Sequence, residues 1–128
     1  MYNNKGQSLV LFVLIIPLLL LLFVLAYDIG NMVLQRRTLD NINQIAINYG
    51  LSHMDNDSLE DKIKEIINKN DNKIIVINYK VIDNTIYLKT EKSYKGIFLG
   101  LLKTKISKVE SSYKGYFDKE KKIIERNK

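Results

Sequence analysis

The sequence predicts an α+β membrane protein, in which a long N-terminal transmembrane helix continues into a small domain with a three-stranded antiparallel sheet. Three observations predict this fold. An unbroken apolar run occupies residues 9–26, apolar residues then recur with helical spacing as far as residue 49, and three segments between residues 73 and 117 alternate as strands do. About a hundred residues follow the apolar run, which is enough for one small domain.

The apolar run Leu9–Ala26 contains no charged side chain, and sixteen of its eighteen residues are Leu, Ile, Val or Phe. Eighteen helical residues rise about 27 Å, close to the thickness of a bilayer's hydrocarbon core. At about −0.3 to −0.6 kcal/mol each, the sixteen residues favour insertion by about 5 to 10 kcal/mol in total. The length of the run, and the apolar pattern that continues beyond it, favour a permanent anchor over a cleaved secretory signal.

The spacing of apolar residues after the run predicts that the same helix continues over residues 28–51, with Gly50 as its C-terminal cap. Polar residues of this segment, including Asp40 and Asn43, are expected to face solvent. The stripe expected to face the sheet consists of Ile29, Met32, Val33, Leu39, Ile42, Ile45, Ala46 and Tyr49.

A short helix over residues 59–68 follows, and we expect Asp57 or Ser58 to cap it. The acidic residues around this cap lack the glycine and the bidentate glutamate of a calcium loop, so we expect no calcium site there. His53 is the only histidine of the chain, and a histidine-based metal site would lack further ligands.

Two strands, 73–82 and 85–94, are predicted to form a hairpin around a tight turn at residues 83–84, and residues 106–117 a third strand. Residues 96–102 predict an apolar turn or helix too short to span a membrane. We expect Ile77, Tyr79, Val81 and Val109 to pack on Ile42, Ile45 and Tyr49. The predicted inward residues are Ile75, Ile77, Tyr79 and Val81, then Ile86, Leu88 and Tyr94, then Val109, Tyr113 and Phe117.

The composition excludes several kinds of site. The chain has no cysteine, so it has no disulfide, no lipid-modified cysteine and no thiolate metal site. It contains no phosphate-binding loop, no paired zinc histidines and no serine-nucleophile elbow. We therefore expect no catalytic residue, no metal site and no cofactor.

The charge is uneven, because residues 73–128 carry fourteen basic and six acidic side chains. An excess of lysine suits an anionic partner. Tyrosine is common in strands and no RNA-binding aromatic motif occurs, so we do not expect nucleic acid to be that partner. The composition leaves open a secreted or membrane-tethered binding module that contacts anionic surface polymers.

The N-terminal segment, residues 5–51, has a distinctive arrangement of residues. A basic residue and a glycine precede a small polar pair, a proline lies near the middle of the apolar run, and an aspartate follows the run. The segment resembles the N-terminal segment of TadE-like (TadE/TadG-type) proteins, which are pilin-like components of tight-adherence (Flp-type) pilus systems. The residues that carry the resemblance are Lys5, Gly6, Gln7, Phe12, Pro17 and Asp28.

The resemblance implies a pilin-like domain and a structural role without enzymatic activity, as a minor pilin or pseudopilin-like component of pilus assembly. It implies cleavage by a prepilin peptidase between Gly6 and Gln7, and packing of the membrane helix through Leu11, Phe12 and Pro17. Other pilin-like subunits, membrane proteins of pilus assembly, the prepilin peptidase and the lipid bilayer are the implied partners. Proline alone predicts only a kink, which membrane helices tolerate.

One position departs from the family pattern, because Leu11 occupies the site five residues after the glycine where such proteins usually carry glutamate. That glutamate is thought to pair with the N-terminal amine of a neighbouring subunit. Leucine makes no such pair, so the departure favours a role at a pilus tip or as a membrane-held assembly factor over ordinary addition along a fibre.

The expected topology is a single pass with the N-terminus in the cytoplasm and the C-terminal domain outside, in the cell membrane or in a surface pilus. Arg36 and Arg37 alone would place the domain in the cytoplasm by the positive-inside rule. Asp28 lies closer to the membrane, and the pilin-like start implies a cytoplasmic N-terminus. The expected divisions are a leader (1–6), a transmembrane helix (7–27), its extramembrane continuation (28–51), an α+β domain (52–117) and a charged tail (118–128), the last forming a frayed helix or loose tail.

Overall fold

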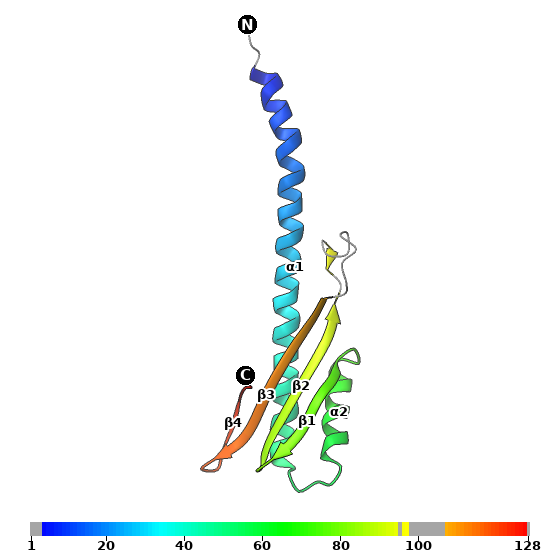
Figure 1. Cartoon of the computed structure of the whole chain (residues 1–128), viewed down its shortest axis with the longest axis vertical. Helices are drawn as coiled ribbons and strands as arrows, with labels where there is room; N and C mark the ends of the chain where they lie inside the picture. The colour runs from blue at the N-terminus through cyan, green and yellow to red at the C-terminus, as the bar shows by residue number, and fades with distance from the viewer. Residues whose placement is uncertain (1–3, 95, 98–106, 128) are drawn as a thin grey trace.

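The computed structural model describes residues 4–94, 96–97 and 107–127, which form an α+β fold. A long helix projects from one end of a small domain in which it packs against a sheet (Figure 1). The elements are α1 (Asn4–Ser52), α2 (Leu59–Asn70), β1 (Ile75–Ile82), β2 (Thr85–Tyr94), β3 (Ser107–Asp118) and β4 (Lys121–Arg126).

Helix α1 is a single helix of 49 residues, which confirms the predicted continuity between its apolar and amphipathic halves. The predicted cap at Gly50 is wrong, because the helix continues to Ser52. Gly50 lies inside the helix where another helix and the sheet come close. A Cβ atom there would lie 2.7 Å from Ile86 Cδ1 and 3.1 Å from Ile63 Cδ1, so glycine permits this close approach.

The sheet has four antiparallel strands in the order β1-β2-β3-β4, so the prediction of three strands is wrong. The segment predicted as a loose tail forms β4 instead. Two-residue turns join the outer pairs of strands, and all four of their residues have positive φ. These are 51° and 61° at Asp83 and Asn84, and 49° and 71° at Lys119 and Glu120. Paired positive φ values match the right-handed twist of a hairpin.

Strand β1 does not bury the face that its alternation predicts. Its register on β2 shifts between Val76 and Asn78, which leaves Ile77 in a bulge with 44% of its surface exposed. A bulge inserts one extra residue and so reverses the faces on its two sides. As a result Val76 packs against the core, and the inward orientation expected of Ile75 and Ile77 is wrong.

The core lies between one face of the sheet and the two helices. The predicted inward residues of β2, Ile86, Leu88 and Tyr94, are buried, as are Val109 and Tyr113 of β3. Helix α1 contributes Leu39, Ile42, Ala46, Ile47 and Leu51, and helix α2 contributes Leu59, Ile63 and Ile67.

Several residues predicted to face this core are exposed instead, among them Ile45 at 53% and Phe117 at 46%. Val81 lies on an outer strand and keeps 43% of its surface exposed. The expected packing of Ile77 and Val81 on Ile45 is therefore wrong. Ile29 and Val33, also assigned to the stripe, are exposed as well.

Helix α2 confirms the predicted short helix, although Ser58 at its N-cap position makes no side-chain capping hydrogen bond. Most of the apolar segment predicted over residues 96–102 lies outside the described residues.

Candidate functional site

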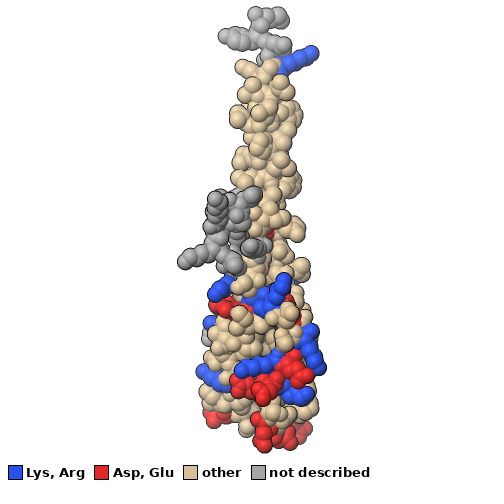
Figure 2. All heavy atoms as spheres, turned by 90° about the vertical axis from the view of Figure 1, so that its right-hand side faces the viewer, with Lys and Arg blue, Asp and Glu red and all other residues tan. Residues whose placement is uncertain are grey.

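The N-terminal half of α1 is a stalk of exposed apolar side chains. The large apolar residues from Leu9 to Phe23 have between 44% and 70% of their surface exposed. Among the described residues this is the one helix long and apolar enough to cross a membrane. On the face that Figure 2 shows, charged side chains gather on the sheet domain, while the stalk above it is covered by uncharged residues up to a basic side chain near its end. A surface of this kind is stable in lipid or against other apolar helices.

The residues singled out from the sequence lie on this stalk. Gly6 and Gln7 lie near the start of α1 and are exposed, and a Cβ atom at Gly6 would have no neighbour within 4 Å. Leu11 and Phe12 are exposed one turn further along, at 55% and 61%, and Pro17 lies within the helix. The five residues thus lie on the exposed stalk, and packing through Leu11, Phe12 and Pro17 calls for contacts from outside the chain.

Asp28 fixes the sheet domain to α1 at the point where the apolar run ends. Its side chain is buried, and its Oδ1 atom accepts a hydrogen bond of 2.8 Å from the backbone N–H of Ile97. Its carbonyl oxygen accepts a hydrogen bond of 3.1 Å from the hydroxyl of Tyr94 at the end of β2. A Cβ atom at Gly96 would lie 2.7 Å from Asp28 Oδ2, so glycine lets the chain reach the helix here. Burial, followed by the nearby charge of Asp28, raises the pKa of Tyr94.

A second set of polar contacts fixes the other half of α1 to the sheet. Asn43 is fully buried, accepts a hydrogen bond of 2.8 Å from the Thr90 hydroxyl, and donates one of 3.2 Å to the Ser111 carbonyl oxygen. The Ser111 hydroxyl donates to Asp40, whose other carboxylate oxygen lies 3.1 Å from Arg126 Nη2. We call these five residues the helix–sheet network. It joins α1 to β2, β3 and β4 in one connected set of hydrogen bonds.

The sequence prediction missed this network, because Asp40 and Asn43 were assigned to the solvent face for their polarity. The spacing carried a usable signal. Asn43 lies four residues after Leu39 and three before Ala46, so it falls on the buried stripe that these two define. No buried side-chain nitrogen or oxygen in the described part of the chain lacks a hydrogen-bond partner.

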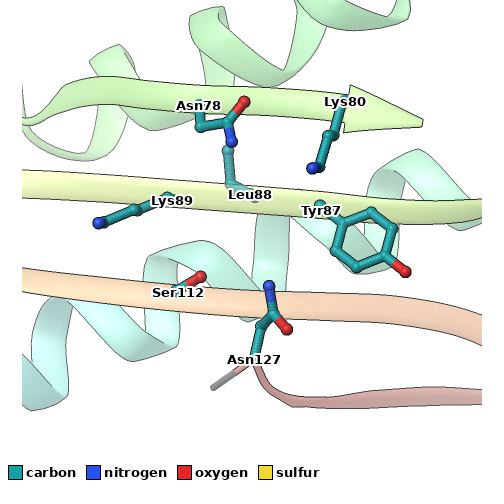
Figure 3. A pocket seen from close by; sticks show the side chains of 7 residues that line it. All are labelled: Asn78, Lys80, Tyr87, Leu88, Lys89, Ser112 and Asn127. Atoms are coloured by element: carbon teal, nitrogen blue, oxygen red, sulfur yellow. The ribbon is translucent and has the colours of Figure 1, made fainter. Parts of the chain in front are cut away.

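The opposite face of the sheet has a shallow polar hollow of about 290 Å³ (Figure 3). Lys80 Nζ lies 5.4 Å from the centroid of the Tyr87 ring, and Lys89 Nζ lies 3.6 Å from a Glu110 oxygen. The residues that line the hollow are Asn78, Lys80, Tyr87, Leu88, Lys89, Ser112 and Asn127. Within the described residues, no group of three or more His, Cys, Asp or Glu side chains is placed to hold a metal ion.

Comparison with known proteins gives no match to any family model, any curated protein or any solved structure. The structure thus defines an α+β protein with one exposed N-terminal helix long and apolar enough to cross a membrane.

Proposed function

We propose that the protein is a membrane-anchored structural component of a TadE-type pilus assembly system, in the role of a minor pilin or pseudopilin-like subunit. One observation carries the proposal: α1 is unbroken over 49 residues, exposes its apolar half and packs its other half on the sheet. The resemblance of residues 5–51 to TadE-like proteins is what connects this architecture to pilus assembly.

In this role the apolar half of α1 lies in the bilayer and the sheet domain lies outside the cell. A prepilin peptidase removes the first six residues at the cytoplasmic face and leaves Gln7 as the new N-terminus. The helix then packs on pilin-like subunits or assembly proteins through Leu11, Phe12 and Pro17. Asp28, with its contacts to Tyr94 and Ile97, supports the proposal because it holds the domain at the end of the span.

The mass of the mature protein tests this function. We expect the chain isolated from membranes of a host with a prepilin peptidase to begin at Gln7. Gly6→Ala should leave it uncut, because such peptidases tolerate little side chain at that position, whereas the matched control Gly30→Ala should be cut normally. A chain that begins at Tyr27 would instead mean secretion, and a chain that keeps Met1 would mean an anchor without pilin-type maturation.

Because leucine occupies position 11, we also expect few copies of this protein per pilus. Burying an unpaired carboxylate costs about 2.5–3.5 kcal/mol at mid-membrane and less near the interface. Leu11→Glu should therefore leave membrane insertion nearly intact, and it should raise the amount found in sheared fibres if a paired amine is available. An abundant wild-type protein along purified fibres would contradict the tip or assembly role.

A second candidate function is a membrane-tethered module that binds anionic surface polymers, and the hollow that contains Lys80 and Lys89 favours it. Co-sedimentation of the membrane-bound protein with dextran sulfate tests this function. We expect the double change Lys80→Ala and Lys89→Ala to abolish binding if the hollow is the site. The matched double change Lys62→Ala and Lys64→Ala on α2 should leave binding unchanged.

A further inference from the structure

The two outer strands of the sheet carry apolar side chains that the fold does not fully bury. In the described part of the chain, β1 pairs as a strand only with β2, and β4 only with β3. Val81 and Ile82 of β1 are 43% and 49% exposed, and Ile123 and Ile124 of β4 are half-buried. Outer strands present unpaired backbone groups and bind further strands unless something blocks them.

The even number of strands determines which edges can meet. In a meander of four antiparallel strands, β1 and β4 run in opposite directions. When two copies stand in the same orientation, β4 of one copy therefore meets β1 of the next as an antiparallel pair. A sheet of three strands would instead present two edges that run in the same direction.

A common orientation follows if every copy is anchored through α1, so this inference rests on the membrane anchoring of the proposed function. Antiparallel pairing of two identical edges, β1 with β1 or β4 with β4, requires a two-fold axis that reverses the strand direction. The strands run obliquely along α1, so that axis would also turn one helix away from the membrane (Figure 1). Among antiparallel arrangements, pairing between unlike edges therefore fits a shared membrane.

The register of the sheet specifies how the edges meet. One row of opposed residues runs across all four strands, from Val81 through Ile86 and Gly115 to Ile124. The next row runs from Lys80 through Tyr87 and Lys114 to Glu125. If these rows continue into a second copy with no shift in register, Ile124 of one copy lies opposite Val81 of the second copy.

In this register the opposed side chains are complementary. Glu125 lies opposite Lys80 of the second copy on one face, and Ile124 lies opposite Val81 on the other. Ile123 lies opposite Ile82, so a further apolar pair forms. Opposite charges and apolar pairs directly across two strands are stabilising. A shift of two residues would place Ile123 opposite Lys80 and Glu125 opposite Asn78, which loses the charge pair and one of the two apolar pairs.

The bulge in β1 limits pairing to this part of the strand. In the unstepped register the six residues of β4, 121–126, lie opposite residues 79–84. All of these lie on the turn side of the register shift between Val76 and Asn78. Four of them, 79–82, belong to β1, so the pairing uses residues 123–126 of β4, and Lys121 and Lys122 lie beside the turn at Asp83 and Asn84.

We propose that the edge of β4 binds the edge of β1 of a second copy of this chain, as an antiparallel pair with Ile124 opposite Val81. Such a contact uses two different surfaces, so it leaves one edge free at each end and builds an open row of copies along the membrane. The row belongs to the membrane-held assembly role and not to the pilus fibre, where few copies are expected. The row joins domains outside the membrane and does not depend on contacts between the membrane helices.

Cysteine cross-linking tests the pairing, because the chain has no cysteine of its own. The full chain carrying both Ile82→Cys and Ile123→Cys is oxidised with copper phenanthroline in the membranes of the cells that express it. Within one chain these positions lie on strands three spacings apart, about 14 Å, which is beyond the reach of a disulfide. We expect a ladder of disulfide-linked dimers, trimers and larger species.

The matched control carries Ile82→Cys with Lys121→Cys, which places the two cysteines on the same face but two residues out of register and keeps both Lys80 and Glu125. It should give a ladder several-fold weaker, because diagonal positions lie about 7–8 Å apart. Equal ladders from the two chains would overturn the register. Abundant dimers from Ile82→Cys alone would overturn the pairing of unlike edges, and no ladder at all would overturn the proposal.

Exchanging the charges of Lys80 and Glu125 tests whether the ladder comes from this specific pairing or only from chains that lie near one another in the membrane. In the Ile82→Cys, Ile123→Cys chain, Lys80→Glu alone and Glu125→Lys alone should each weaken the ladder, and the two together should restore it. Determining the mature N-terminus of the same sample distinguishes a failure of the pairing from a failure of the proposed function. A membrane-bound chain that begins at Gln7 but gives no ladder would overturn the pairing alone, and a chain that begins at Tyr27 and still gives the ladder would overturn the proposed function alone.

Discussion

At the scale of single residues, Asn43 determines how α1 lies on the sheet. Its amide is fully buried and bonds β2 through Thr90 and β3 through Ser111. A buried polar group that loses its hydrogen-bond partner costs more than the bond itself contributed. The helix–sheet network therefore favours one rotation and one height of the helix, where apolar packing alone would tolerate several.

We expect Asn43→Ala to lower the free energy of unfolding by about 1–3 kcal/mol, because the Thr90 hydroxyl then stays buried without an acceptor. Urea unfolding of the full chain in detergent micelles, followed by the circular dichroism of the sheet domain, measures the change. Asn41→Ala, an exposed amide on the same helix, should change stability by less than about 0.5 kcal/mol. Equal effects of the two changes would contradict the role of the network.

The ion pair between Asp71 and Lys92 gives the domain a dependence on pH. A hydrogen bond from Lys92 Nζ, at 2.5 Å, lowers the pKa of Asp71. Because the folded pKa lies below the unfolded value of about 3.9, the pair stabilises the fold above that pH, and this stability is lost as the pH falls through the folded pKa.

Asp71→Asn should therefore flatten the fall in stability below about pH 4, relative to the wild-type protein. Unfolding midpoints in urea between about pH 7 and pH 3 measure this. Lys92→Met removes the same pair and should flatten the profile in the same range. If the stability of both variants falls with pH as steeply as that of the wild-type protein, the pair does not contribute to this pH dependence.

At the scale of elements, the two glycines inside α1 have different surroundings. A Cβ atom at Gly30 would have no neighbour within 4 Å, whereas one at Gly50 would press on the ends of Ile86 and Ile63. Alanine favours a helix over glycine by about 0.5–1 kcal/mol. Overpacking a core costs about 1–3 kcal/mol, so it outweighs that gain where space is absent.

Gly30→Ala should therefore stabilise the protein by about 0.5–1 kcal/mol, and Gly50→Ala should destabilise it. Thermal unfolding of the full chain in micelles gives the direction of both changes. A gain in stability from Gly50→Ala would mean that the two isoleucines yield more easily than their packing indicates.

Leu88 and Ile77 lie on neighbouring strands, but they contribute very differently to the stability of the core. Leu88 is 1% exposed, and Leu88→Ala should cost about 2–5 kcal/mol. Ile77 lies half-exposed in the bulge, so Ile77→Ala should cost far less, although the alternation of the sequence assigned it to the core. Comparable losses from the two changes, measured by urea unfolding, would contradict the bulge.

The elements also show how far a sequence predicts this fold. The apolar run and the stripe after it were enough for α1, and Asp83-Asn84 marked the first hairpin because these residue types tolerate positive φ. Lys119 and Glu120 adopt the same geometry without that preference, so β4 was not predicted. The bulge at Ile77 leaves no trace in an alternating pattern.

The candidate site was only partly predictable for a related reason. Leu11 and Phe12 were assigned from the N-terminal pattern and do lie exposed on α1, and their packing role stays a prediction. The helix–sheet network was missed because polarity was taken to indicate solvent exposure. Only the sheet supplies the partners, Thr90 and Ser111, that make burial of Asn43 favourable.

At the scale of the whole molecule, the charged domain and the uncharged stalk give the topology a direct test (Figure 2). Asp118→Cys places a single cysteine at the end of β3, next to the exposed turn before β4. We expect a membrane-impermeant maleimide to label it in intact cells. Labelling only after lysis would place the domain in the cytoplasm, as Arg36 and Arg37 alone would suggest.

The unbroken course of α1 has a mechanical consequence. The same helix that would lie in lipid also forms the spine of the domain, and Asp28 ties β2 to it at the junction. From Asp28 to Ser52 the helix extends about 36 Å, so a change of about 10° in the tilt of the span would move the far end of the domain by about 6 Å. If the apolar half of α1 lies in the membrane as proposed, a change in bilayer thickness or in a neighbouring helix would therefore displace the β1 and β4 edges.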